Sequence, residues 1–232
     1  TVAGWAAERE LPLHAHVSEQ PAENEACIAA YGRTPVELLA EAGALSDRFT
    51  ASHVTHPTDR DRSLLGAAAS TVCLCPTTER DLADGIGPAS GLAAAGARLA
   101  VGSDSQAVID LFEESRAIEL DERLATLERG RQDAAALLRA TTADGQRAIG
   151  WPEAGALEPG RLADLVCLGS ESVRLAGITT DSAVASIVFA ATAADVTDVI
   201  VGGEFVVRDG RHCTLDVERE LRESIAALGG AR

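Results

Sequence analysis

Short apolar runs alternate with helix-like segments through the first part of the chain, and three runs deliver a side chain that can bind a metal ion or move a proton. These side chains are His16 in residues 11–19, His53 in residues 50–56 and Asp104 in residues 99–104. Strands that alternate with helices pair in parallel through right-handed crossovers. A barrel of such strands gathers its functional groups at the C-terminal strand ends. The pattern therefore predicts one wall of a metal-dependent (β/α) barrel.

The predicted secondary structure follows two different patterns, with the boundary between them near residue 150. Before it we expect strands and helices in alternation, with strands at residues 11–17, 49–53, 71–75 and 98–102 and helices at 21–31, 59–68, 87–95, 110–129 and 133–149. A further helix is expected to begin at Pro35, with Thr34 as its N-cap. After it we expect strands following residue 155, at 185–190 and at 196–210, the last a hairpin that turns at Gly202-Gly203. Residues 1–150 are thus predicted as half an α/β barrel, 151–213 as a small β-rich unit and 214–232 as a C-terminal helix.

Charge and composition exclude several classes of function. The net charge of −16 argues against nucleic acid and against anionic membrane surfaces, and no run of 18 apolar residues predicts a membrane span. All 20 basic residues are arginine, so the chain has no lysine for a phosphate-binding loop, a Schiff base or a carboxylated bridge between two metal ions. A small-molecule substrate and a single metal ion are the expectations that remain.

Cysteine and methionine usage add two expectations. Five cysteines without a leader segment predict reduced thiols in the cytoplasm, and Cys73 and Cys75 are expected to pack on one strand face because no second pair completes a zinc site. The chain contains no methionine and starts with a helix-like pattern at Thr1. We therefore expect that an N-terminal part of the protein precedes this sequence.

The candidate site residues are His16, Glu19, His53 and Asp104. Imidazole nitrogens are natural ligands of zinc and ferrous iron, and a carboxylate in the following loop can face the same cavity and carry protons. Taken singly, each residue is more often a surface, hydrogen-bonding or capping group than part of a site. His14 forms an H-x-H pair with His16 but is expected to pack beside the strand instead. Together, the residues predict part of one metal site.

These motifs resemble the amidohydrolase superfamily, and within it the formimidoylglutamate deiminases of histidine degradation. The resemblance is carried by the motifs at residues 14–20, 53–56, 75–85 and 102–105, by the helix that starts at Asp110, and by residues 160–166 and 201–210. It implies a C-terminal half of a (β/α)8 barrel, about strands 5–8, with part of a small β-sandwich. It also implies hydrolysis of N-formimidoyl-L-glutamate to N-formyl-L-glutamate and ammonia.

Carried over residue by residue, the resemblance implies that His16 and Asp104 bind one divalent metal, zinc or alternatively ferrous iron. It implies that Glu19 moves protons, that His53 polarises or orients the substrate, and that Asp104 also takes a proton from water. The first-strand H-x-H ligands and the substrate-binding residues are not in this sequence, and Gln106 stands where many relatives carry histidine. The chain by itself is therefore expected to be inactive.

Other readings stay open. The full-length protein could be another deaminase of the same superfamily, acting on guanine, a thioadenosine or a triazine. The chain could also be an inactive truncated remnant of such an enzyme. A homodimer of the full-length protein is a further open expectation.

Overall fold

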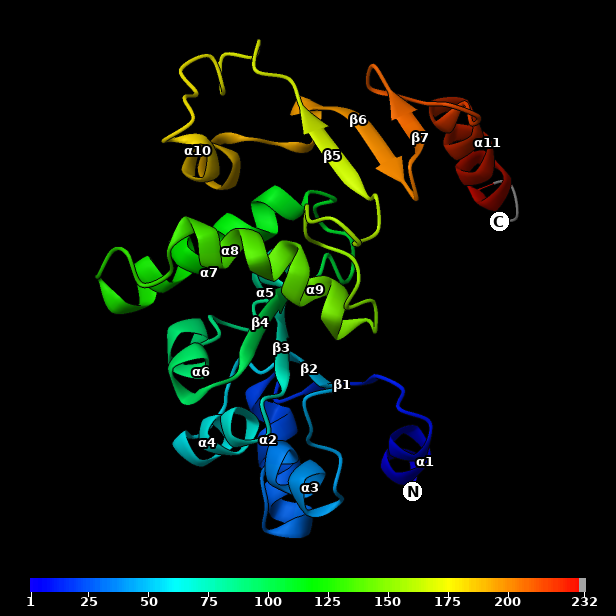
Figure 1. The fold of residues 1–232 in the computed structure, drawn as a ribbon. Helices are drawn as coiled ribbons and strands as arrows, with labels where there is room; N and C mark the ends of the chain where they lie inside the picture. Colours follow the sequence, from blue (N-terminus) through cyan, green and yellow to red (C-terminus); the bar gives the residue numbers. More distant parts are fainter. Residues whose placement is uncertain (230–232) are drawn as a thin grey trace.

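A computed structural model describes residues 1–229, whose strands form two four-stranded sheets (Figure 1). The first sheet is entirely parallel and keeps the chain order, with β1 (Leu13–Val17), β2 (Phe49–His53), β3 (Thr71–Leu74) and β4 (Arg98–Val101). The predicted strands of this part are confirmed, each within two residues of its expected bounds. The α/β class with a parallel sheet is confirmed with them.

Helices connect these strands. They are α1 (Val2–Glu8) before β1, α2 (Pro21–Tyr31) and α3 (Pro35–Glu41) before β2, α4 (Asp59–Ala67) before β3, and α5 (Pro76–Asp81) and α6 (Ala89–Ala95) before β4. Thr34 and Thr58 begin α3 and α4 with capping boxes, which satisfy backbone N–H groups at the helix starts. Helix α5 is the only one of these that the sequence pattern did not predict separately, because it follows β3 directly.

The core lies between the parallel sheet and its helices. Its buried apolar side chains come from the strands and from the helices that cover them, among them Val17, Phe49, Ala51, Leu65, Val72, Leu74 and Leu92. The register pairs His16 with Ser52 and Val17 with His53. The C-terminal ends of β1 and β2 therefore lie side by side, so that the side chains at these two strand ends are at the same edge of the sheet.

One glycine lets two helices approach closely. A Cβ atom on Gly66, in α4, would lie 1.9 Å from the carbonyl oxygen of Ala95 at the end of α6. Gly96 then ends α6 in the left-handed conformation, with φ 104°. The packing of α4 on α6 thus depends on the absence of a side chain at residue 66.

After β4 the chain forms α7 (Leu111–Thr126), α8 (Ala134–Thr141) and α9 (Ala143–Ala148). The expectation of one continuous helix over residues 133–149 is wrong. Thr142 has φ −120° and ψ −100°, which breaks the helix between α8 and α9. The sequence pattern does not reveal such a break, because α9 begins directly after Thr142.

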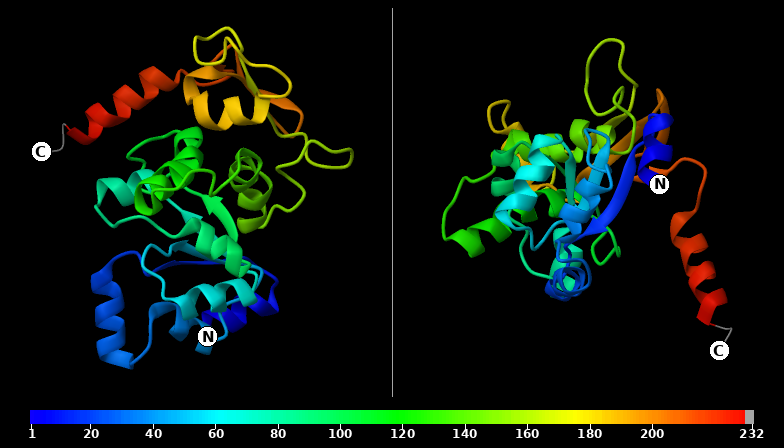
Figure 2. Two further views of the ribbon diagram at one scale, coloured as in Figure 1. Left: turned by 90° about the vertical axis from the view of Figure 1, so that its left-hand side faces the viewer. Right: turned by 90° about the horizontal axis from the view of Figure 1, so that it is seen from below.

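The second sheet is antiparallel, with β5 (Leu165–Leu168), β6 (Val196–Val201), β7 (Glu204–Arg208) and β8 (Arg211–His212). The predicted hairpin is confirmed, since Gly202 and Gly203 join β6 to β7 with positive φ angles. Helices α7, α8 and α9 lie between this sheet and the parallel sheet (Figures 1 and 2).

The strand predicted at residues 185–190 is wrong, because this segment is helix α10 (Ala183–Ala190). Val188 is buried, and Arg116 from α7 donates hydrogen bonds to the carbonyl oxygens of Phe189 and Ala191. These contacts satisfy the C-terminal carbonyls of a helix. A short apolar run has no period that separates a helix from a buried strand, so packing decided the outcome.

The C-terminal segment forms α11 (Val217–Gly229), which extends away from the rest of the chain (Figure 2). Within the C-terminal unit expected at residues 214–232, the structure has a helix at Val217–Gly229, and residues 230–232 lie outside the described part. Within residues 1–229, no helix combines the length and the apolar character needed to cross a membrane.

A buried carboxylate fixes the loop that follows α7. Glu119 accepts hydrogen bonds from Gly130 N at 2.7 Å, Gln132 N at 2.8 Å and Arg123 Nε at 2.8 Å. Burial by itself raises the pKa of the Glu119 carboxyl, but these bonds outweigh burial and hold the pKa below its usual value. Stabilisation from a depressed pKa is complete above the unfolded value of about 4.3 and is lost as the pH falls through the lower folded value.

We expect Glu119→Gln to lower the free energy of unfolding at pH 7 by about 1.5–3 kcal/mol, because hydrogen bonds to a charged group are lost. The deficit should shrink as the pH falls below the unfolded value of about 4.3 and through the lower folded pKa of Glu119, where the wild-type carboxylate also takes up a proton. Urea unfolding at a series of pH values measures both effects. Glu128→Gln is the control, since Glu128 pairs with Arg131 at the surface. Equal stability of wild type and Glu119→Gln at pH 7 would contradict this role.

Candidate active site

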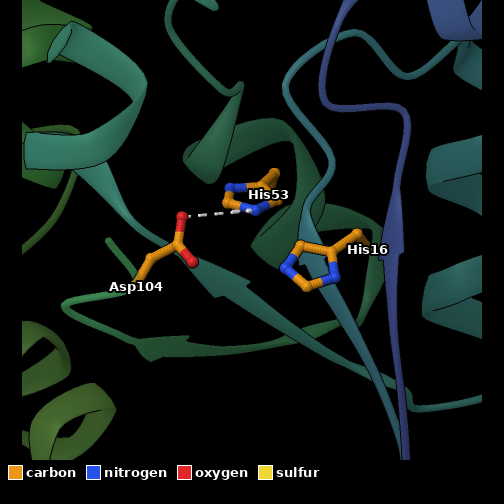
Figure 3. Close-up of side chains that lie close together, drawn as sticks. All are labelled: His16, His53 and Asp104. Atoms are coloured by element: carbon orange, nitrogen blue, oxygen red, sulfur yellow. Dashed lines mark ion pairs between the residues drawn. The ribbon is translucent and has the colours of Figure 1, made fainter. Parts of the chain in front are cut away.

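Three side chains from different strand ends meet at the C-terminal edge of the parallel sheet (Figure 3). His16 lies in β1, His53 ends β2 and Asp104 follows β4, and their ligand atoms all lie within 4.8 Å of one another. The rings of His16 and His53 stack with centroids 5.2 Å apart, and His53 Nε2 is 3.9 Å from Asp104 Oδ2. The structure thus brings the sequence-predicted residues together.

The backbone at these strand ends is strained. Ser18, His53, Val54 and Asp104 all have positive φ angles, of 52°, 69°, 53° and 41°. This region is unfavourable for a β-branched residue such as Val54, and such residues cluster at functional sites. A hydrogen bond from Val54 N to the carbonyl of Val17, at 3.0 Å, holds the turn in place. His53 is thus the last residue of β2 and the first residue of this turn.

Glu19 is held beside this cluster by the first turn of α2. The carboxylate of Glu23 accepts hydrogen bonds from Ser18 N at 2.9 Å and Glu19 N at 2.8 Å, which fixes the loop. Glu19 Oε1 then lies 3.7 Å from His53 Nε2. Burial, and the neighbouring Asp84 carboxylate, raise the pKa of Glu19 against the opposing effect of His53. A carboxyl with a raised pKa is suited to pass a proton on near neutral pH.

The His53 ring is fully buried and has different neighbours on its two nitrogens. Nδ1 lies 3.4 Å from Glu79 Oε1. Nε2 has no hydrogen-bond partner among residues 1–229, although it is buried. Burial lowers the pKa of His53, but the carboxylates of Glu79, Glu19 and Asp104 together outweigh it, and the net pKa is raised.

These observations fit a divalent metal. Two imidazoles and one carboxylate form a nitrogen and oxygen donor set of the kind that binds zinc. The unpartnered Nε2 of His53 faces the same point as Asp104, and a buried polar atom without a partner is costly unless something binds it.

The other histidines of this region bind backbone groups. His14 shares a strand face with His16 but donates from Nε2 to the carbonyl of Ala148, in α9, at 2.8 Å. His56 donates from Nε2 to the carbonyl of Asp84 at 2.6 Å. Neither belongs to the cluster of ligand atoms found in the described residues.

Sequence reasoning missed the roles of two acidic residues in the motif at residues 75–85. Glu79 contacts His53, and buried Asp84 accepts a hydrogen bond from Gln20 Nε2 at 2.8 Å, next to Glu19. The signal that could have found them was present. Both are acidic residues in a motif that carried the family resemblance, but their partners lie 26 and 64 residues away in the sequence.

The sequence profile of the amidohydrolase family matches residues 2–206. The chain belongs to the amidohydrolase family. The predicted resemblance is confirmed. The chain is 36% identical over 227 residues to a formimidoylglutamate deiminase of Pseudomonas aeruginosa, covering 95% of this chain and 49% of that protein. It is 33% identical to a 5-methylthioadenosine/S-adenosylhomocysteine deaminase of Pelotomaculum thermopropionicum, covering 96% of this chain and 52% of that protein.

A solved structure supports the same family. The chain superimposes on an adenosine deaminase of Xanthomonas campestris, crystallised with bound zinc, with a TM-score of 0.87 and 29% identity. This match covers 97% of the chain and 53% of that protein. The chain thus spans about half the length of the relatives that it matches. The named relatives are deaminases or deiminases, which indicates a hydrolase.

Proposed function

We propose that this amidohydrolase chain supplies strands 5–8 of a metal-dependent barrel, and that the full-length protein is a formimidoylglutamate deiminase. The observation that carries the proposal is the convergence of His16, His53 and Asp104 at one sheet edge, with His53 Nε2 unpartnered among the described residues. The 36% identity to a formimidoylglutamate deiminase supports the choice of substrate. The proposal places the first-strand H-x-H ligands in a part of the protein outside this chain, which is in line with a chain that covers 49% and 52% of the two relatives.

His16 and Asp104 would hold the metal, with His53 beside them. A divalent metal bound there supplies a Lewis acid and makes water a better nucleophile. Asp104 can accept a proton from the attacking water, and His53 can orient or polarise the substrate. Glu19 can deliver a proton to the nitrogen that leaves as ammonia. In the net reaction, water replaces the imino nitrogen of the amidine by oxygen.

An ammonia-release assay of the full-length protein tests this proposal. N-Formimidoyl-L-glutamate should be hydrolysed with a higher kcat/KM than guanine and 5′-methylthioadenosine. A preference for methylthioadenosine would favour the second candidate, a thioadenosine deaminase, which the 33% identity to such an enzyme supports. Ammonia from none of the three, together with no bound metal, would favour an inactive remnant.

We expect one divalent metal ion per chain of the full-length protein. His16→Ala should release most of it, because one of the few protein ligands is lost. Elemental analysis after exhaustive dialysis measures the metal content. His212→Ala is the matched control, since His212 lies in β8 of the second sheet. A content near two ions in the wild type, or unchanged content in His16→Ala, would contradict the proposed site.

A further inference from the structure

The acidic side chain of Glu79 is packed directly against the buried ring of His53. Glu79 lies in α5, is 4% exposed, and places Oε1 3.4 Å from His53 Nδ1. The same oxygen accepts a hydrogen bond from the backbone N–H of Cys75 at 2.8 Å. A backbone N–H can only donate, so Oε1 acts as an acceptor at this point.

The position of Glu79 is fixed from two sides. Its bond to Cys75 N caps the start of α5, where Pro76 has no N–H to offer. Thr77, in the same turn, donates from its backbone N–H and its hydroxyl to buried Glu114 of α7. Hydrogen bonds thus hold α5 at its own start and against α7. They leave Glu79 Oε1 little freedom to move away from His53.

An acceptor at Nδ1 determines which nitrogen of the neutral ring carries the proton. If Oε1 accepts from Nδ1, the proton is on Nδ1 and the lone pair is on Nε2. Nε2 faces the site, with Glu19 Oε1 at 3.7 Å and Asp104 Oδ2 at 3.9 Å, and His16 stacks on the ring. Both carboxylates lie beyond hydrogen-bond distance of Nε2, so Glu79 is the group that selects the tautomer.

We propose that Glu79 is a positioning residue that holds His53 as the Nδ1–H tautomer and so presents the Nε2 lone pair to the site. Partners of this kind fix the orientation and the tautomer of functional histidines in many sites. The consequence for turnover rests on the proposed function. The tautomer itself does not, because it follows from the contact between Glu79 and His53.

The test is ¹⁵N NMR of the histidine rings in the full-length protein, at an alkaline pH where the neutral ring dominates. The His53 signals are assigned by their loss in His53→Gln. Wild type should show His53 with Nδ1 protonated. Glu79→Gln keeps an acceptor oxygen and should retain this tautomer, whereas Glu79→Met keeps the length without an acceptor and should lose it. Asp121→Asn is the control, since Asp121 pairs with Arg80.

Wild type with His53 protonated on Nε2 would overturn the proposal, and so would an Nδ1–H tautomer that persists in Glu79→Met. The wild-type spectrum decides the matter even if Glu79→Met does not fold. On the preferred substrate, Glu79→Met should lower kcat by about 10- to 100-fold with little change in KM, and Glu79→Gln should restore most of it. A protein that releases no ammonia, yet shows the expected tautomers, would refute the proposed function and support the role of Glu79.

Discussion

Replacing Glu19 by glutamine is expected to lower kcat of the full-length protein by about 10²- to 10⁴-fold, the usual contribution of a positioned proton carrier. Glutamine has the size and hydrogen-bonding reach of glutamate but cannot hand on a proton. Oε1 of Glu19 lies 3.7 Å from His53 Nε2, within the site. Burial raises the pKa of Glu19, which favours a carboxyl that can hold and donate a proton. Steady-state ammonia release at saturating substrate measures the effect.

The control for this prediction is Glu25, in helix α2, which follows the loop of Glu19. Glu25→Gln changes an exposed carboxylate of α2 and should leave kcat within about twofold of wild type, as surface changes away from a site are usually small. Metal content and melting temperature of Glu19→Gln should match wild type. Turnover of Glu19→Gln close to that of wild type would show that another group carries the proton.

Gly66→Ala is expected to destabilise the fold by about 1–3 kcal/mol or more, the range found when an atom is forced into a packed core. The new methyl carbon would lie 1.9 Å from the backbone oxygen of Ala95, and backbone cannot rotate away as a side chain can. Helices α4 and α6 would have to separate. Urea unfolding at neutral pH measures the loss.

Gly177→Ala makes the same chemical change in open space. No atom lies within 4 Å of a Cβ added at Gly177, so its stability should stay within about 0.5 kcal/mol of wild type. If Gly66→Ala were as stable as Gly177→Ala, the close approach of α4 and α6 would not exist as described.

The parallel part of the fold was predictable because its elements carry local signals. The strands are short apolar runs, and Thr34 and Thr58 mark helix starts through their capping boxes. His16, His53 and Asp104 could be found because parallel strands end at one edge of a sheet. Each strand and helix start can be predicted from the residues of one segment, and the meeting of the three side chains follows when a rule of chain geometry is added.

What escaped prediction depends on contacts between distant segments. Helix α10 is stabilised by Arg116 from α7, 73 residues before its partner Phe189, and no local pattern signals that contact. His14 was expected to pack beside the strand, but its partner, the carbonyl of Ala148, lies 134 residues away and has no local signal. From the sequence, Glu79 is an ordinary acidic residue in the first turn of a helix, and only the structure shows its contact with His53.

The left-handed turn at His53 and Val54 has a consequence for how the molecule responds to heat. It is held by hydrogen bonds to the loop end of β1, from Val54 N to Val17 O at 3.0 Å and from His56 N to Ser18 O at 3.1 Å. Strained backbone relaxes when such supports weaken, while the packed strands below keep their own contacts. We therefore expect the turn at His53 and Val54 to open at a lower temperature than the parallel sheet below it.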